Sequence, residues 1–147
     1  MFVMVDLTSY HLSRIIIHCG LTGVNDVVFE HNVEDEYDTK TNTIKINKNR
    51  SLRNQLYILL HEYGHHQIVK DERLAKKFFC IIERDPNNTL SEQILAIEEE
   101  ILAWHFGEEL AKFLEIDLTD KNYQVLKAKC LKSHIRSYTK VINDKKE

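Results

Sequence analysis

The amino-acid sequence predicts one α+β domain that is mainly helical and carries a small β-sheet in its N-terminal third. Its 147 residues have the length of a single compact domain. Only one Pro and four Gly are present, which disfavours a turn-rich all-β protein and leaves room for long helices. Helical periodicity covers most of the chain, whereas β-branched and alternating runs occur only between residues 27 and 48.

The N-terminal third predicts one helix and two strands. Residues 6–20 have helical periodicity, and the β-branched run VVFEHNV at 27–33 is typical of a strand. Residues 43–48 alternate apolar and polar side chains and predict a half-buried strand, the second arm of a hairpin with 27–33. The residues expected to cap or end the helix are Asp6 or Thr8 at its start and Gly20 at its end.

The remaining chain predicts four helices, over residues 51–70, 71–84, 89–115 and 117–141, followed by a frayed tail at 143–147. No repeat, linker or low-complexity tract interrupts them, so residues 1–147 are expected to form one domain. The expected start and stop signals are Ser51 as an N-cap, Pro86-Asn87-Asn88 as a stop, the capping box of Thr89 and Glu92, and Asp117-Leu118-Thr119-Asp120 before the last helix.

The charge distribution excludes a protein that coats DNA, because the formal net charge is −3. Residues 83–120 carry 11 acidic and 2 basic side chains, and residues 121–147 carry 8 basic and 2 acidic ones. We interpret the basic segment as the solvated face of a helix rather than as a docking site for an acidic partner. No nucleic-acid partner is expected.

The cysteines and the N-terminus predict a cytoplasmic protein. The three cysteines are an odd number without a CxxC pair, which fits a reducing compartment and no disulfide framework. The segment MFVMVDLTSY lacks the basic and long apolar regions of a signal peptide. No run approaches the roughly 18 apolar residues of a membrane span, so no membrane anchor is expected.

One motif carries catalytic chemistry: residues 61–65 read H-E-x-x-H within the predicted helix 51–70. His61 and His65 lie one turn apart on the same helix face, so their imidazoles can bind one Zn²⁺. Glu62 is angled toward the water on such a metal, where it would act as general base.

A catalytic zinc needs a third protein ligand, and the residues alone leave several candidates open. The extended motif would require Gly at 68 and His at 71, but the chain has Ile68 and Asp71 there. Asp71 would ligate only if the helix broke. The other candidates are a glutamate of the downstream cluster Glu98, Glu99 and Glu100, or His105.

The segments LYILLHEYGHH and EEEILAWHFGEELAKFL together resemble the ImmA/IrrE-like zinc metallopeptidases, small intracellular gluzincins of phages and mobile elements. The resemblance covers about residues 40–115. The second motif of that family is E-x-x-A-x-x-F-A, matched here by Glu100, Ala103, Phe106 and, in place of the last Ala, Gly107. This resemblance implies a zincin-like minimal metallopeptidase fold, Zn²⁺ as cofactor, and Glu100 as the third metal ligand.

The expected activity is zinc-dependent hydrolysis of an intracellular protein or peptide, a regulatory protein being one candidate, with Glu62 as general base. The substrate is expected to add to the strand at 43–47, whose Lys-bearing composition is typical of an edge strand. The alternative is a zinc-binding regulatory or protein-interaction module of phage origin with little or no proteolysis. A third hypothesis is a structural component whose motif is accidental. The predicted substrate-binding residues are Thr43, Ile44, Lys45 and Ile46.

Several other residues receive weaker interpretations. Gly64 either lets the Glu100 helix approach closely or is simply tolerated. His66 is expected to be exposed. His134, with Tyr138 one turn later, offers a donor for an oxyanion, although a surface or core role is preferred. Cys80 and Cys130 are expected in the core, and Tyr37, Tyr123 and His31 in ordinary surface or core positions.

Overall fold

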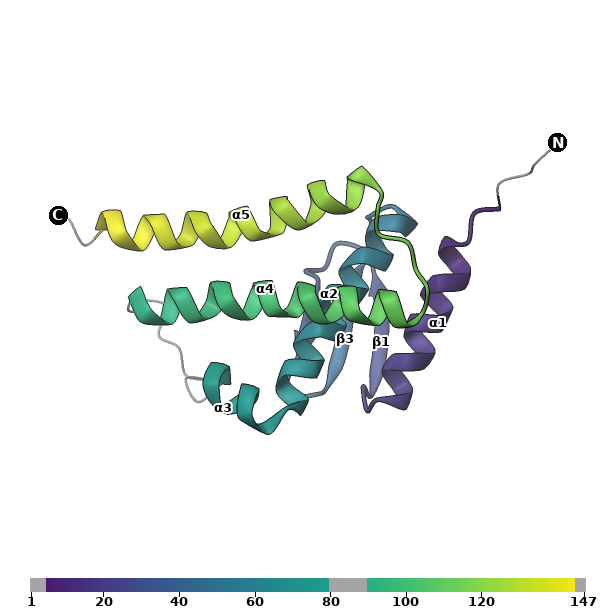
Figure 1. Cartoon of the computed structure of the whole chain (residues 1–147), viewed down its shortest axis with the longest axis horizontal. Helices are drawn as coiled ribbons and strands as arrows, with labels where there is room; N and C mark the ends of the chain where they lie inside the picture. Colours follow the sequence, from purple (N-terminus) through teal and green to yellow (C-terminus); the bar gives the residue numbers. More distant parts are fainter. Residues whose placement is uncertain (1–4, 80–89, 145–147) are drawn as a thin grey trace.

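The computed structural model of the chain describes residues 5–79 and 90–144 and confirms a mainly helical α+β fold (Figure 1). The described residues form five helices and one three-stranded sheet. In chain order these elements are α1 (Thr8–Leu21), β1 (Asp26–Glu30), β2 (Glu36–Asp38), β3 (Thr43–Asn47), α2 (Leu52–Lys70), α3 (Glu72–Phe79), α4 (Leu90–Phe113) and α5 (Lys121–Asp144).

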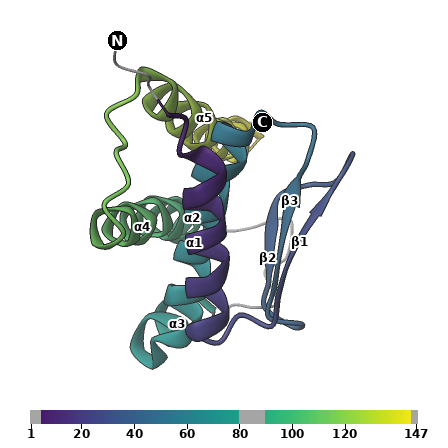
Figure 2. The same ribbon diagram turned by 90° about the vertical axis from the view of Figure 1, so that its right-hand side faces the viewer.

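Helix α2 lies at the centre of the molecule. The sheet covers one side of it, and α4 packs on the other side while α1 lies alongside (Figure 2). All residues from Gln55 to Gly64 are buried. A helix surrounded in this way buries its polar residues as well as its apolar ones. The H-E-x-x-H motif at 61–65 therefore lies largely inside the fold.

The sheet differs from the prediction in its topology. The strand order is β1-β3-β2, with β1 parallel to β3 and β2 antiparallel to it. The hairpin partner of β3 is therefore β2, a three-residue strand within the polar segment that sequence reasoning treated as a loop. Ile44 and Ile46 on β3 are fully buried against the helical core. Because β3 has a partner on both sides, the prediction that 43–47 is an edge strand is wrong.

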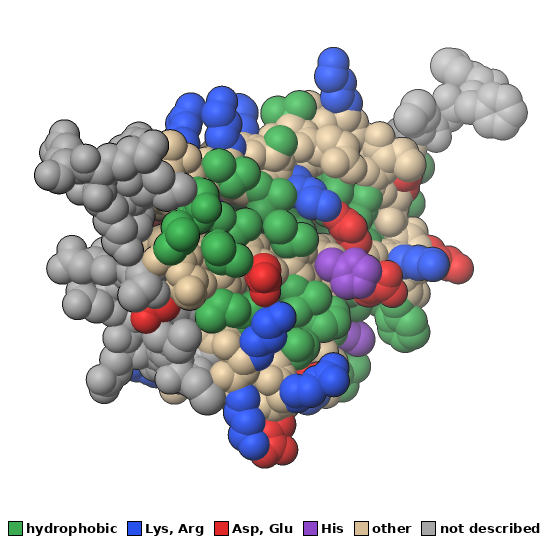
Figure 3. Space-filling view, turned by 60° about the vertical axis from the view of Figure 1, so that its left-hand side comes forward, with side chains coloured by type: hydrophobic (Ala, Val, Ile, Leu, Met, Phe, Trp, Pro, Cys, Tyr) green, Lys and Arg blue, Asp and Glu red, His purple; other side chains and the backbone are tan. Residues whose placement is uncertain are grey.

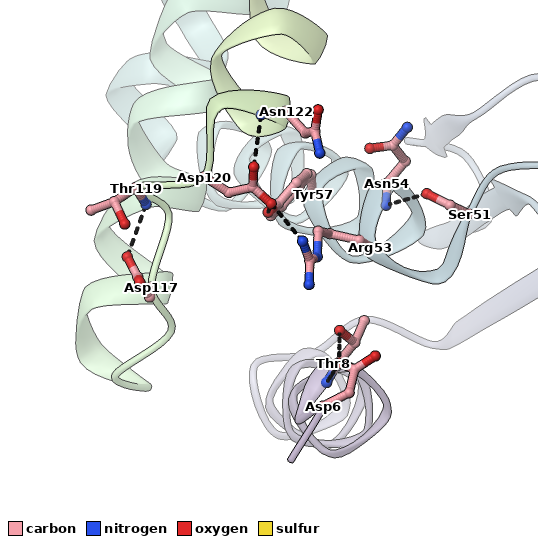
Figure 4. A network of polar contacts seen from close by, with 10 residues as sticks. All are labelled: Asp6, Thr8, Ser51, Arg53, Asn54, Tyr57, Asp117, Thr119, Asp120 and Asn122. Carbon is pink, nitrogen blue, oxygen red and sulfur yellow. Dashed lines mark hydrogen bonds and ion pairs between the residues drawn. The ribbon is translucent and has the colours of Figure 1, made fainter. Parts of the chain in front are cut away.

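Side-chain oxygens accept backbone N–H groups near the start of three helices (Figure 4), although the N-cap position of α1 is Leu7 and not the predicted Asp6 or Thr8. Asp6 accepts hydrogen bonds from the backbone N–H and the hydroxyl of Thr8 before α1. Ser51 accepts from the N–H of Asn54 at the start of α2, as its N-cap position predicts. Asp120 accepts from the N–H of Asn122 at the start of α5 and also pairs with Arg53 of α2 at 2.7 Å, which ties the start of α5 to the start of α2.

The ends of the last helices correct the predicted boundaries. Helix α4 stops at Phe113 rather than near Glu115, which adopts a left-handed conformation with φ of 58° and so ends the helix. Helix α5 reaches Asp144, so two residues of the predicted frayed tail are helical. The predicted stop at 86–88, the cap at Thr89 and the core position of Cys80 lie outside the described residues.

Helices α4 and α5 leave part of their apolar surface uncovered. Figure 3 shows hydrophobic side chains gathered near the middle of one face of the molecule. The large exposed side chains on these two helices include Leu90, Ile94, Ile101 and Ile135. The inner side of α4 is instead buried against α2, through residues that include Ala103, Trp104 and Gly107. This inner side carries the third candidate ligand.

Candidate metal centre

The three residues of the H-E-x-x-H motif share one side of α2. The side chains of His61 and Glu62 are buried, each residue retaining 6% exposure, and His65 is half-buried. All three line a cavity of about 460 Å³ between α2, α4, α5 and the segment around β2. The helical spacing of one turn brings the two imidazoles together, with ring centroids 4.6 Å apart.

Helix α4 brings Glu100 onto these imidazoles. One carboxylate oxygen, Oε2, lies 3.0 Å from His61 Nε2, and the other, Oε1, lies 3.2 Å from His65 Nε2. The two Nε2 atoms are themselves 3.2 Å apart. His61, His65 and Glu100 form a candidate metal site. Within the described residues they are the one group of three or more His, Cys, Asp or Glu side chains whose donor atoms all lie within 4.8 Å of one another.

The donor set fits a zinc ion. Tetrahedral zinc with bonds of about 2.0–2.1 Å holds its ligand atoms about 3.3 Å apart. The separations between the three donors, 3.0–3.2 Å, are close to this value. Two imidazoles and one carboxylate form a donor set of catalytic zinc sites, in which the fourth position stays open for water or substrate. The residues that would hold the ion are therefore His61, His65 and Glu100.

The other ligand candidates lie in different surroundings. Glu98 is exposed and pairs with Lys77 at 3.2 Å, and His105 is exposed beside Glu109. Asp71 follows α2 and accepts hydrogen bonds from the first backbone N–H groups of α3. Neither Glu98, His105 nor Asp71 lines the cavity. Among the candidates left open by the sequence, the glutamate beside both histidines is Glu100.

Each histidine is held by a different neighbour. His65 Nδ1 lies 3.2 Å from Glu99 Oε1, so its N–H can donate to that carboxylate while Nε2 faces the donor set. His61 stacks on Trp104, with ring centroids 4.3 Å apart, and its buried Nδ1 has no hydrogen-bond partner. A carboxylate on the far nitrogen of a ligating histidine fixes the ring and raises its basicity. Sequence reasoning weighed Glu99 as a ligand and missed this role.

We expect Glu99→Ala to weaken zinc binding by roughly 10- to 100-fold, because His65 loses the acceptor that orients its ring. A titration against a chromophoric chelator measures this change. Glu98→Ala is the matched control, since the neighbouring exposed glutamate contacts Lys77 and not a histidine. Equal zinc affinities for the two variants would contradict the orienting role of Glu99.

Two glycines allow α2 and α4 to approach closely. A Cβ on Gly64 would overlap the backbone carbonyl of Ala103, and a Cβ on Gly107 would lie 2.6 Å from the carbonyl oxygen of Leu60. Of the two interpretations of Gly64, the structure supports close helix approach. Because α4 packs at backbone distance here, the carboxylate of Glu100 reaches both imidazoles.

The electrostatics of the buried carboxylates differ. Burial raises the pKa of Glu62, although nearby His61 and His65 act in the opposite direction. Burial also acts to raise the pKa of Glu100, but the hydrogen bonds with His61 and His65 outweigh it and hold that pKa well below the usual range. Glu100 is therefore an anion suited to a cation, while Glu62 accepts a proton more readily than an exposed glutamate does.

His65 experiences two opposing influences. Burial alone would lower its pKa, whereas the hydrogen bonds with Glu100 and Glu99 raise the pKa well above its ordinary value. The two carboxylates thus favour a positive charge at this position, which a metal cation can supply in place of a proton.

Further cavity residues come from loops and from α5. His134 Nε2 lies 3.5 Å from Glu100 Oε2, so the structure places this histidine beside the donor set rather than in a remote surface position. Cys130 is half-buried; it packs against the hydrophobic core, as predicted, and also lines the cavity. The other lining residues outside the motif include Asp35, Glu36, Tyr37, Thr39, Arg50 and Ser133. Most of these belong to the region of β2, for which the sequence carried no signal.

Two further predictions are corrected. His66 is buried, with 4% exposure, because Tyr37 and the loop after α1 cover its side of α2; its Nδ1 lies 3.2 Å from the Tyr37 hydroxyl and its Nε2 3.1 Å from the carbonyl oxygen of Thr22. The substrate-binding role assigned to Thr43, Ile44, Lys45 and Ile46 loses its basis, because β3 is the central strand and these four residues do not line the cavity.

No family model, curated protein or solved structure matches this chain. The resemblance to ImmA/IrrE-like metallopeptidases thus depends on the two motifs, and the zincin-like identity of the fold stays a prediction. Among the described helices, none combines the length and apolar character needed to cross a membrane.

Proposed function

We propose that this chain is a zinc-dependent peptidase of the H-E-x-x-H type. The observation that supports this most strongly is the convergence of His61, His65 and Glu100 from two helices, with the buried Glu62 on the wall of the same cavity. A structural zinc site would use all four positions for protein ligands, whereas this donor set offers three beside an open cavity. Three potential ligands, an adjacent base and room for a substrate together support a hydrolytic site.

Glu62 would perform the proton transfers. It would accept a proton from the attacking water and pass it to the leaving amine of the cleaved peptide bond. A bound zinc ion would supply the acidified water and the polarisation of the scissile carbonyl. The raised pKa of Glu62 suits the first of these transfers, because a carboxylate whose pKa is raised by burial takes a proton from water more readily than an ordinary carboxylate does.

His134 would stabilise the negative charge that develops on the carbonyl oxygen. Its Nε2 lies 3.5 Å from Glu100 Oε2, the residue lines the cavity, and its side chain is 42% exposed. A donor at this position can reach an oxygen bound near the donor set. Such preorganised donors act most strongly on charge that appears only in the transition state.

We expect His134→Ala to lower peptidase activity by roughly 10²- to 10³-fold while zinc content stays at its wild-type value. Initial rates on a cleaved peptide and elemental analysis of the same samples measure both quantities. His105→Ala is the matched control, because His105 is exposed on α4 and does not line the cavity. Loss of zinc from His134→Ala, or full activity, would refute this role.

The substrate would bind along β2 instead of β3. In the described sheet β2 is an edge strand, and Glu36 and Tyr37 on it line the cavity. An extended peptide can add to such an edge through backbone hydrogen bonds, which place one residue of the peptide opposite each residue of the strand. A peptide bound in this way would lie close to the donor set of His61, His65 and Glu100.

The test of the proposed function is hydrolysis of a proteome-derived peptide mixture by the zinc-loaded protein. New peptide termini identified by mass spectrometry should appear with zinc and disappear when a chelator removes it. Zinc binding without any new termini would instead favour the zinc-binding regulatory module.

A further inference from the structure

Arg50 is a cavity residue that hydrolysis itself does not require. It follows β3 and precedes α2, and its side chain is 32% exposed. Its Nε donates to Asp35 Oδ2 at 2.8 Å, and the other oxygen of Asp35 accepts the backbone N–H of Asn47 at 2.7 Å. The side-chain amide of Gln55 donates to the Arg50 carbonyl at 2.7 Å. Both the backbone and the base of the guanidinium are therefore held in place.

The outer nitrogens of Arg50 remain available. Over residues 5–79 and 90–144, neither Nη of Arg50 has a hydrogen-bond partner. Arg50 and Asp35 both line the cavity that contains the donor set. A guanidinium fixed through Nε presents its two Nη groups as a fork, and the ligand that matches this fork is a carboxylate.

We infer that Arg50 binds a carboxylate of the substrate and so selects which peptide bond reaches Glu62. The inference deepens the proposed peptidase function and rests on it. The carboxylate is either the side chain of an Asp or Glu in the peptide or the free C-terminus. Asp35 acts as a positioning residue that holds the guanidinium, since both of its oxygens are already engaged by the chain.

The position of Arg50 sets the place of the carboxylate in the peptide. Asp35 lies just before β2, whereas Tyr37 bonds to His66, which follows the ligand His65 on α2. A peptide paired with β2 advances about 3.4 Å per residue, in step with the strand. Tyr37 and Thr39, which also line the cavity, lie two and four positions after Asp35, so the selected carboxylate would lie about two to four residues from the cleaved bond.

The other charged residues of the cavity restrict the preference for an acidic residue to one position of the bound peptide. Glu36, Glu62 and Glu99 also line the cavity, and like charges repel an acidic side chain placed beside them. Among the described residues that line the cavity, Arg50 is the one Lys or Arg. An acidic residue is therefore favoured at one position of the peptide and disfavoured at its neighbours.

The experiment uses zinc-loaded Glu62→Gln, which would hold peptides without cleaving them, immobilised and exposed to a proteome-derived peptide mixture. Retained peptides should be enriched in those with an Asp, a Glu or a free C-terminus at a constant position. For the best retained peptide, replacing that Asp or Glu by its amide, or amidating the C-terminus, distinguishes the two sources of the carboxylate. The effective replacement should weaken binding by roughly 10- to 100-fold.

The same peptides are then bound to the Arg50→Gln variant carrying Glu62→Gln. The acidic and amidated peptides should now bind equally weakly, because the guanidinium that distinguishes a carboxylate from an amide is absent. Arg50→Lys, which keeps the charge without the fork, should bind the acidic peptide with intermediate affinity. Melting temperature and zinc content show whether each variant keeps its fold. The comparison of acidic with amidated peptides uses the same protein throughout, so it does not depend on the folding of a variant.

Four outcomes overturn the inference. Arg50 has no part in substrate selection if the retained peptides share no carboxylate at a constant position. The same holds if removing that carboxylate weakens binding equally with and without Arg50. Cleavage by the wild type at sites without such a carboxylate also excludes Arg50 from substrate selection and leaves the peptidase function standing. If no peptide is retained and the wild type cleaves none, the proposed function and the inference fail together.

Discussion

Glu62→Gln should abolish peptide hydrolysis while leaving zinc content unchanged. The glutamine keeps the size of the side chain but cannot accept the proton, so the rate should fall by roughly 10²- to 10⁴-fold. Glu62 is buried with 6% exposure, and burial raises its pKa. A neutral amide costs less to bury than a charged carboxylate, so the variant should be at least as stable as the wild type. Rates on a cleaved peptide and elemental analysis test both expectations.

The control for this variant is His61→Ala. His61 Nε2 belongs to the donor set, so its loss should remove zinc and activity together. If Glu62→Gln loses zinc as completely as His61→Ala does, then Glu62 is part of the metal site and not the general base.

Gly64→Ala should destabilise the protein and weaken zinc binding, although alanine is the better helix former by about 1 kcal/mol. The added Cβ would overlap the carbonyl of Ala103, which belongs to the backbone and cannot rotate away. Forcing α2 and α4 apart costs about 3 kcal/mol or more, so the melting temperature should fall by several degrees. Zinc affinity should fall too, since Glu100 moves away from His61 and His65 with its helix.

Gly20→Ala provides the matched control. This glycine lies in α1, and a Cβ added there would meet no atom within 4 Å. The substitution should be neutral or stabilise the protein by about 0.4–1 kcal/mol, because alanine restricts the unfolded chain. A wild-type melting temperature and zinc affinity for Gly64→Ala would show that the two helices need no backbone contact to form the site.

The local part of the site could be predicted from the sequence. The spacing of His61 and His65 on one helix face is a property of a single helix, so the pattern alone brings the two imidazoles together. Glu100 was preferred through the resemblance to a family, since helix geometry alone did not exclude Glu98. The structure separates the two through their neighbours: Glu98 contacts Lys77, and Glu100 contacts both histidines.

The parts that depend on tertiary contacts could not be predicted. Strand β2 has three residues, Glu36–Asp38, two of them acidic, and forms only because β3 offers it a partner. With β2 unrecognised, neither the central position of β3 nor the cavity wall around Asp35 and Tyr37 could be seen. His66 is buried for the same reason, since its cover comes from Tyr37 and from the loop that contains Thr22.

Zinc titration of the purified protein and of three single variants tests the central claim most directly. We expect the wild type to bind one equivalent of zinc through the three donors His61, His65 and Glu100. Glu98→Ala should keep the wild-type affinity, Glu99→Ala should lose part of it, and Glu100→Ala should lose most of it. A wild type that binds no zinc after reconstitution, or a Glu98→Ala variant that loses the metal while Glu100→Ala retains it, would contradict the account.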